Sequence, residues 1–330
     1  MAKNADAIEA RLRALKWIGA KESIVELAPA GEGNMNRTLR ANLGSRSIVL
    51  KQSVPFVAKY PDIPAPLERA SVEAAFYAAA STSDVVSRRM PQLLGYDDEN
   101  RLLCFEDLGA AQDFTSLYAA IEADDIHADL ISLIDWLGAL HALDIDGAFA
   151  NNAMRELNHQ HIFVVPLLAD NGVAIESELT PLYESFTHDE ALGAHAQRLG
   201  AIYLGTASHD SRPVLLHGDF YPGSWLNHRT EGAMVIDPEF GFKGAPEFDV
   251  GVFTAHLTMC GYRQSAITTL LENYHAPDGF DSRLASGFAG MEVIRRIFGV
   301  AQLPLSADVE TQAEWLNTAR TSVVASGAYD

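Results

Sequence analysis

Hydrophobic and polar positions change their period about one third of the way along the chain. Up to residue 107, short runs of apolar residues bounded by turn residues predominate, which is typical of β-strands. Beyond that point apolar residues recur every three or four positions, which is typical of amphipathic helices. The expected strands are 24–27, 37–42, 47–52, 92–96 and 101–105. The expected helices are an N-terminal one, 66–80, 125–143, 188–206, 249–262, 263–274, 282–300 and 307–325.

This order of elements predicts an α+β fold with two lobes. Residues 1–107 would form an N-terminal lobe from an antiparallel sheet and a helix, and residues 108–330 a mainly helical C-terminal lobe. The segment 106–109 would be the hinge. Two stretches depart from the helical pattern of the second part. A hairpin is expected within 215–240, and 147–168 is too weakly periodic to predict an element.

The charge and cysteine content narrow the class of partner. The net charge of −20 over 330 residues disfavours nucleic acid and anionic membranes, because both would be repelled. The N-terminus carries charges throughout, unlike a signal peptide, and no apolar run has the length of a membrane span. Cys104 and Cys260 lie in apolar segments without metal-ligand spacing, as expected of buried thiols. These features favour a cytoplasmic protein that acts on a small molecule.

Two acidic segments could carry chemistry. Asp219 lies in a His-Gly-Asp turn after an apolar run, and Asp237 and Glu239 end the next apolar run. Phosphoryl transfer needs one carboxylate that orients the acceptor hydroxyl or accepts its proton, beside other carboxylates that hold Mg²⁺. Ser224, five residues after Asp219, would supply a hydroxyl where many kinases place an asparagine ligand. The alternatives are a turn cap for Asp219 and a surface turn for the acidic pair.

A glycine-bearing turn between two expected strands is a candidate phosphate loop. It contains Gly31, Gly33 and Asn34. Glycine allows the backbone to approach a phosphate closely, but an ordinary hairpin turn would have the same composition.

Lys51 ends the following apolar strand. A lysine there can reach the α- and β-phosphates of a nucleotide and be held by a glutamate of the next helix. Glu73 is the expected partner, and Glu68 is the weaker candidate. The alternative is a lysine that faces solvent on an edge strand.

Two adjacent arginines lie inside an apolar helix. Side chains of Arg295 and Arg296 point about 100° apart, so both cannot face solvent if the neighbouring isoleucines face the core. At least one should reach an internal cavity or a carboxylate, and a salt bridge is the commoner outcome. Two further residues are expected to be structural: His217 would hold its loop, while Asp249 would cap the next helix and brace the same loop.

Taken together, these segments resemble the 5-methylthioribose kinase family, within the wider aminoglycoside phosphotransferase and choline kinase group. The similar segments occur in the family's order between Gly31 and Ala301. They are Gly-Glu-Gly-Asn-Met-Asn, Leu-Lys-Gln-Ser-Val-Pro-Phe-Val, Glu-Arg-Ala-Ser-Val-Glu, Phe-Glu-Asp-Leu, His-Gly-Asp-Phe-Tyr-Pro-Gly-Ser, Asp-Pro-Glu-Phe-Gly-Phe and Arg-Arg-Ile-Phe-Gly-Val-Ala. The family usually has His-Thr where this chain has Phe220, Tyr221 and Pro222, and this chain is shorter.

The resemblance implies a bilobal protein-kinase-like fold and transfer of the γ-phosphoryl group of ATP to the C1 hydroxyl of a sugar. Asp219 would be the catalytic residue, and Asp237 and Glu239 the Mg²⁺ ligands. Lys51 would contact the phosphates. The remaining implied sites are the adenine hinge Glu106, Asp107 and Leu108, and the sugar site Tyr221, Arg295 and Arg296.

Two alternatives to this function remain open, and so does the oligomeric state. The acceptor could be another 5-modified pentose, an aminoglycoside or an amino alcohol, or the protein could bind nucleotides without catalysis. The resemblance alone suggests a homodimer.

Overall fold

The computed structural model describes residues 5–31, 35–119, 126–145 and 149–327. Gly33 and Asn34 of the glycine turn lie outside these ranges. Within the described residues no helix combines the length and the apolar character needed to cross a bilayer.

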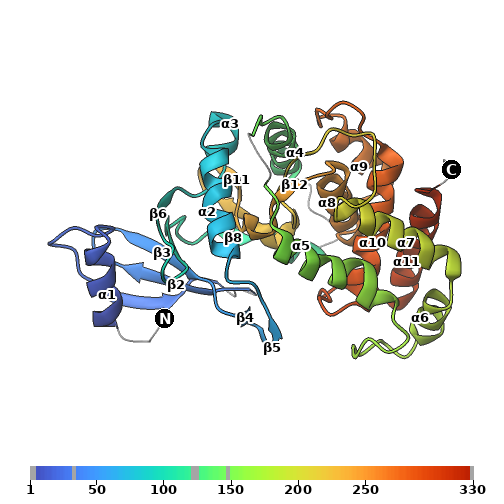
Figure 1. Cartoon of the computed structure of the whole chain (residues 1–330), viewed down its shortest axis with the longest axis horizontal. Coiled ribbons are helices and arrows are strands. Elements are labelled where there is room, and N and C mark those ends of the chain that lie inside the picture. The colour runs from blue at the N-terminus through green and yellow to red at the C-terminus, as the bar shows by residue number, and fades with distance from the viewer. Residues whose placement is uncertain (1–4, 32–34, 120–125, 146–148, 328–330) are drawn as a thin grey trace.

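A five-stranded antiparallel sheet forms the N-terminal part (Figure 1). Its strands, in spatial order, are β1 (Glu26–Pro29), β2 (Arg37–Asn42), β3 (Ser47–Gln52), β7 (Leu102–Glu106) and β6 (Leu93–Asp97). Helix α1 (Ala5–Ala14) covers one face, where Leu12 packs with Ile48 and Leu50. Helix α2 (Arg69–Ala80) lies between the sheet and the helical part of the molecule. Because side chains alternate along a strand, Lys51 points away from the face that buries Leu50.

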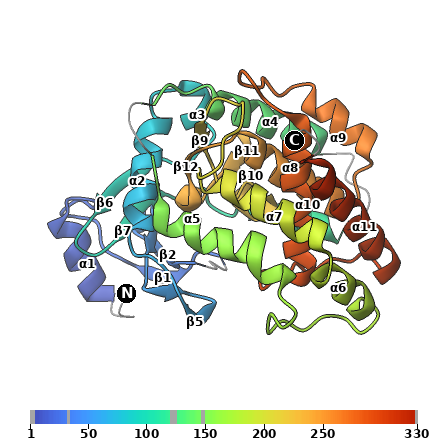
Figure 2. The same cartoon turned by 45° about the vertical axis from the view of Figure 1, so that its right-hand side comes forward.

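The second part is mainly helical and is built around α10 (Ser282–Phe298), which packs against α8 and α11. Figure 2 shows α5 and α7 running along the side of this part. The other helices are α4 (His127–His141), α5 (Asn152–His159), α6 (Thr180–Thr187), α7 (Glu190–Tyr203), α8 (Glu247–Met259), α9 (Gln264–Leu271) and α11 (Val309–Ala325). Short strands lie between the two parts: β8 (Gln112–Asp113) joins the hairpin β10 (Trp225–His228) and β11 (Gly232–Val235), while β9 (Val214–Leu216) pairs with β12 (Phe242–Gly244). The predicted two-lobed α+β architecture is confirmed.

Several boundaries and elements differ from the prediction. β1 begins two residues later than expected, because its register pairs Glu26 with Asn42. Helix α2 begins at Arg69 rather than 66, since the carbonyl of Pro66 accepts a hydrogen bond from the Arg69 side chain instead of joining a helix. Asp249 lies inside α8 and does not cap it, although it does brace the loop.

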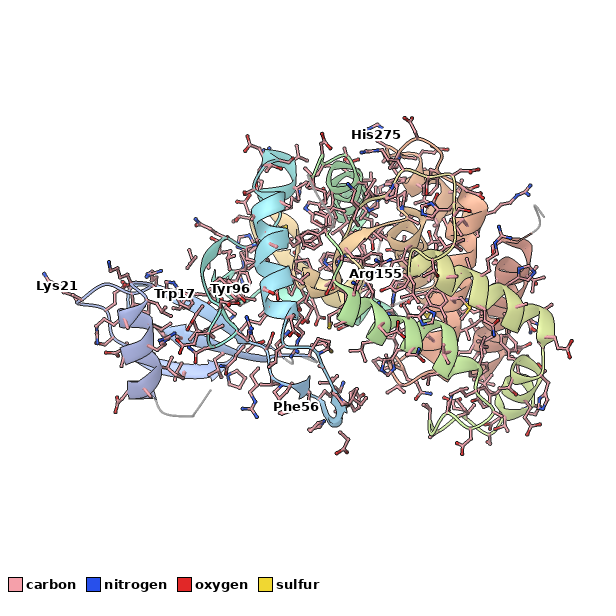
Figure 3. All side chains as sticks on the ribbon, viewed as in Figure 1. Trp17, Lys21, Phe56, Tyr96, Arg155 and His275 are labelled. Atoms are coloured by element: carbon pink, nitrogen blue, oxygen red, sulfur yellow. The ribbon has the colours of Figure 1, made fainter. Side chains whose placement is uncertain are left out.

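Several elements were not predicted, among them α6 and β8. The hairpin of β4 (Phe56–Val57) and β5 (Tyr60–Pro64) projects from the N-terminal lobe, where Figure 3 shows Phe56, and α3 (Asp84–Ser87) is a single turn. The weakly periodic stretch contains α5 followed by a π-helical turn, η3 (Gln160–Val164). Helix α5 buries only Met154 and the polar Asn158, and the π turn changes the spacing. Both features obscure a 3.6-residue period.

Candidate active site

Two adjoining cavities lie at the junction of the lobes. The larger, of about 620 Å³, is lined by Gly31, Lys51, Glu106 and Leu108 among others. The smaller, of about 390 Å³, is lined by Asp219, Tyr221, Ser224, Arg295 and Arg296. Both cavities include Asp113, Thr115, Gly223 and Asp237 in their walls. We call them the nucleotide cavity and the acceptor cavity, after the residues that the sequence analysis assigned to each.

Lys51 connects three elements at the back of the nucleotide cavity. Its Nζ lies 2.8 Å from Glu73 Oε2 on α2 and 2.6 Å from Asp237 Oδ1, which follows β11. Glu73, not Glu68, is therefore the partner. Burial alone would lower the pKa of Lys51, but the nearby carboxylates of Asp237 and Glu73 outweigh burial and raise the pKa. The ammonium is therefore charged and buried, and the solvent-facing alternative is wrong.

Carboxylates outnumber cations in this cluster. Lys51 and Arg69 face three acids, since Arg69 Nε also lies 3.2 Å from Glu239 Oε2. Burial, with smaller contributions from the neighbouring acids Glu239 and Asp237, raises the pKa of Glu73 above its usual range. A divalent cation would offset this excess negative charge, and carboxylate oxygens are the ligands that Mg²⁺ prefers.

Asp237 is the acid best placed to bind such a cation. Its side chain is 45% exposed and lines both cavities. Its backbone is left-handed, with φ of 61°, which is uncommon for a residue other than glycine and recurs at functional sites. Asp237 thus pairs with buried Lys51 at the wall of two cavities, a position that fits a metal ligand and not a turn on the outer surface.

Glu239 has contacts in the N-terminal lobe. Both of its carboxylate oxygens accept from Asn36 Nδ2, at 3.0 and 2.8 Å, and its side chain is buried. Arg69, fully buried, also donates to Asn36 Oδ1 and to the carbonyls of Met35 and Val54. Glu239 therefore ties the segment after β11 to the end of the glycine turn.

The loop that carries Asp219 is held by buried polar contacts. Asp249 on α8 accepts hydrogen bonds from the backbone N–H groups of His217 and Gly218. The His217 ring donates from Nε2 to the carbonyl of Ile236, and burial lowers its pKa, so the ring is neutral. Gly218 has φ of 84°, and a Cβ there would lie 2.2 Å from the carbonyl oxygen of Phe240. Only glycine fits this turn, and His217 is structural as expected.

Asp219 does not cap its turn with its side chain. Its Oδ1 lies 3.1 Å from Arg295 Nη2 and 3.2 Å from Arg296 Nη2. Ser224 donates from Oγ to the main-chain carbonyl of Asp219 at 2.9 Å, which closes the loop. Both arginines thus reach a carboxylate and line the acceptor cavity.

Glu292, one turn earlier on α10, holds the two arginines. Its carboxylate lies 2.5 Å from Arg295 Nε and 2.8 Å from Arg296 Nε. Burial would raise the pKa of Glu292, but the two guanidinium groups outweigh it and hold the pKa well below its usual range. Tyr221 packs its ring against Arg296, 4.7 Å from the guanidinium carbon.

A second buried contact continues from Glu292. His256 Nε2 lies 2.8 Å from Glu292 Oε1, and His256 Nδ1 lies 2.6 Å from the Tyr118 hydroxyl. Burial, and to a smaller extent the two arginines, lower the pKa of His256 to about 4. The neutral ring therefore donates from Nε2 to Glu292 and accepts from Tyr118.

The expected hinge lies along the nucleotide cavity. Glu106, Asp107 and Leu108 all line it. The Asp107 side chain is directed to Arg40 Nε at 2.7 Å, and although burial opposes the effect, Arg40 and Ser47 lower the pKa of Asp107. Any contribution of Asp107 to nucleotide binding would therefore come from its backbone, as at an adenine hinge.

Every predicted site residue within the described ranges lies on one of the two cavities. Four further members of the site were not predicted from the sequence: Asn36, Arg69, His161 and Glu292. For Glu292 a signal existed: an acid three and four residues before two arginines in one helix is positioned to pair with both. Arg69 and Asn36 could not be assigned from spacing, because their partner Glu239 lies far along the chain, 203 residues away in the case of Asn36.

The chain is similar in sequence to methylthioribose kinases. Methylthioribose kinase of Exiguobacterium sibiricum is 28% identical over 92% of this chain and 86% of the relative. Methylthioribose kinase of Bacillus velezensis is 26% identical over 83% of this chain and 78% of the relative.

Solved structures share the fold at lower identity. Choline kinase LicA from Streptococcus pneumoniae has a TM-score of 0.56 at 14% identity, with 96% of this chain and 98% of that chain covered. Spectinomycin phosphotransferase APH(9)-Ia, in complex with ADP and spectinomycin, has a TM-score of 0.54 at 11% identity, with 99% of each chain covered. The predicted bilobal kinase-like fold is confirmed. Residues 26–285 match the family model named APH, phosphotransferase enzyme family, and the chain belongs to this family.

Proposed function

We propose that the protein is an ATP-dependent kinase that transfers the γ-phosphoryl group to a hydroxyl of a small sugar, most specifically the C1 hydroxyl of 5-methylthioribose. One observation carries the proposal: Asp219 faces the acceptor cavity, while Asp237 lines both this cavity and the nucleotide cavity. A hydroxyl beside Asp219 and a phosphate beside Asp237 would therefore meet at the shared wall. Phosphoryl transfer requires that arrangement.

The residues of the nucleotide cavity would bind and orient ATP. Lys51 would contact the α- and β-phosphates, and Gly31 would allow the backbone to approach them, with φ of 82°. Glu106 to Leu108 would hold adenine through backbone groups. Asp237 and Glu239, with Ser224, would be the ligands of Mg²⁺, and the ion would neutralise charge on the phosphates when bound. Glu239 would exchange its present contact with Asn36 for this role.

The residues of the acceptor cavity would orient the hydroxyl. Asp219 would accept its hydrogen bond, and then its proton as the bond to phosphorus forms. Arg295 and Arg296 fix the position of the Asp219 carboxylate, because both donate to Oδ1. Since phosphoryl transfer passes through a loose transition state, positioning and charge stabilisation would supply most of the rate enhancement.

The lining of the acceptor cavity supports an uncharged sugar over a cationic acceptor. Arg295 and Arg296 pair with Asp219, so this carboxylate would not be free to attract the ammonium group of an aminoglycoside or an amino alcohol. Val57 and Ile63 add apolar surface suited to a methylthio group. The names of the relatives in E. sibiricum and B. velezensis point to the same acceptor.

We further propose that residues 1–107 and 108–330 act as two lobes that close over the substrates. Asn36 and Arg69 on one side and Glu239 on the other join the proposed lobes by direct contacts. Segment 106–109 would absorb the motion.

ADP release from MgATP tests the proposal. We expect saturable turnover with 5-methylthioribose and little with ribose, choline or an aminoglycoside. Turnover only with another acceptor would keep the kinase chemistry and contradict the sugar assignment. No turnover above the rate of ATP hydrolysis, with any acceptor of the panel, would contradict the proposed function.

A further inference from the structure

His161 is a histidine of the acceptor cavity that the mechanism above does not use. It lies in the π-helical turn η3, where the N–H of Val165 bonds to the carbonyl of Gln160 across five residues. Single π turns inside helices are frequent at functional sites. The turn packs against α7 and α10, and it directs His161 to the cavity while Ile162 and Phe163 are buried.

Neighbouring polar groups of the cavity are already engaged within the protein. Asn158 donates to the Tyr203 hydroxyl and the Gly218 carbonyl, Gln302 donates to two carbonyls, and Ser224 donates to Asp219. The imidazole of His161, by contrast, has no hydrogen-bond partner among the described residues. It is therefore available to a molecule in the cavity.

The charge around His161 fixes the role that its ring can have. Burial, and to a smaller extent the charge of Arg295, lower the pKa of His161, so the ring is neutral at neutral pH. A neutral imidazole offers one N–H donor and one nitrogen acceptor. Arginine only donates and an ionised carboxylate only accepts. His161 thus complements a hydroxyl group, which also donates and accepts.

We propose that His161 is an acceptor-binding residue that hydrogen-bonds a ring hydroxyl of the sugar other than the one that receives the phosphoryl group. This inference rests on the proposed function, because it assigns the occupant of the acceptor cavity. It places a specificity determinant in the segment whose sequence predicted no structure.

Variants of the full-length enzyme test the proposal, because a loss of His161 should change the kinetics for the acceptor and leave those for ATP unchanged. We expect His161→Ala to lower kcat/KM for 5-methylthioribose about tenfold, the effect of one lost hydrogen bond, with an unchanged KM for ATP. His161→Gln, which keeps a donor and an acceptor, should recover part of the loss. Gln160→Ala is the matched control, since Gln160 is exposed in the same turn and outside the cavity walls.

Deoxy analogues of the sugar identify the hydroxyl. For one of the two analogues, the 2-deoxy or the 3-deoxy sugar, kcat/KM of the wild-type enzyme should be about tenfold lower than for 5-methylthioribose. With that analogue, His161→Ala and wild type should have the same kcat/KM, because the hydrogen bond is already absent. Equal kcat/KM for 5-methylthioribose in wild type, His161→Ala and Gln160→Ala would overturn the proposal while the proposed function stands.

Failure of the proposed function gives a different result. If wild-type enzyme turns over no acceptor, calorimetric titration with 5-methylthioribose still decides the role of His161. Weaker binding to His161→Ala than to Gln160→Ala supports it. Equal binding to both, or none to either, overturns it.

Discussion

The nucleotide cavity and the acceptor cavity share a wall but are assembled differently. At the nucleotide cavity, Lys51, Glu73 and Asp237 come from β3, α2 and the segment after β11. At the acceptor cavity, the two arginines and the acid Glu292 all come from α10, whose last nine residues, 290–298, are all buried. Opening of the lobes would separate the first set, whereas the second set would stay together. We therefore expect nucleotide binding to depend on lobe closure, and the arrangement of Glu292, Arg295 and Arg296 to be fixed beforehand.

The charge balance also differs between the two parts of the site. The nucleotide half consists of Lys51, Arg69, Glu73, Asp237 and Glu239, and the acceptor half of Asp219, Glu292, Arg295 and Arg296. The nucleotide half has three carboxylates for two cations. The acceptor half has two of each, because Asp219 and Glu292 face Arg295 and Arg296. Only the first half needs a bound cation to become balanced, so Mg²⁺ dependence should arise there.

Asp219→Asn should have the largest effect, because Asp219 belongs to the acceptor half and orients the hydroxyl that attacks the phosphoryl group held by the nucleotide half. We expect kcat to fall about a thousandfold, the loss of a proton acceptor and of its orientation, with ATP affinity unchanged. ADP release and calorimetric titration with nucleotide measure the two quantities. Asp210→Asn, at an exposed aspartate, is the control. A variant with kcat within a factor of ten of wild type would remove Asp219 from the reaction.

Glu292→Ala removes the buried carboxylate that holds the two arginines of the acceptor half and leaves the nucleotide half unchanged. Removing one member of a buried ionic cluster costs about 3–5 kcal/mol, because the remaining charges lose their partner without regaining water. Urea denaturation measures the loss in the free energy of unfolding. Glu314→Ala, at an exposed site on α11, should change it by less than about 0.5 kcal/mol. A loss below about 1 kcal/mol for Glu292→Ala would mean that the arginines do not depend on it.

Lys51→Met removes the buried ammonium group of the nucleotide half and leaves the acceptor half unchanged. We expect kcat/KM for ATP to fall about a hundredfold, because the phosphates lose a buried cation, with the acceptor KM unchanged. Lys21→Met is the control, since Lys21 lies at the end of the N-terminal lobe far from both cavities (Figure 3). A change in the acceptor KM with unchanged ATP kinetics would contradict the separation of the two halves.

Each half of the site could be predicted from the sequence only in part. Lys51 and Asp237 occur in short motifs at the ends of regular strands, and Glu73 lies in the helix that follows Lys51. The boundaries of β2 and β3 agree with the expected 37–42 and 47–52 because alternation and a glycine turn define them locally. Such local patterns fix both the element and the direction of its side chains.

The remainder depends on contacts between distant segments. His161 lies in a π turn that no 3.6-residue period can reveal. Burial of His256 follows from packing of α8 against α10, and its partners Tyr118 and Glu292 are 138 and 36 residues away. Sequence spacing gives no information about pairs of this kind.

The smallest predicted effect concerns His256, which contacts Glu292 of the acceptor half. It makes the stability of the protein depend on pH. The ordinary pKa of histidine is 6.5, and burial lowers that of His256 to about 4. Between these values the unfolded chain binds a proton at His256 that the folded protein does not, so the free energy of unfolding falls as the pH falls. Burial raises the pKa of Tyr118 and of Tyr221, so both rings stay neutral in this range. Glu292 and Arg296 stay charged, because against the effect of burial their attraction lowers the pKa of Glu292 and raises that of Arg296.

We expect His256 to account for about 2 kcal/mol of lost stability between pH 7 and pH 5. Urea denaturation of wild type and His256→Asn at both pH values isolates this contribution, because all other titrating groups are common to the two proteins. The variant should lose about 2 kcal/mol less than wild type over the interval, whatever its stability at pH 7. His188→Asn, at an exposed histidine, should lose as much as wild type. If wild type and His256→Asn lose the same free energy of unfolding over this interval, burial does not lower the pKa of His256. The folded protein would then bind a proton at this ring beside Arg295 and Arg296.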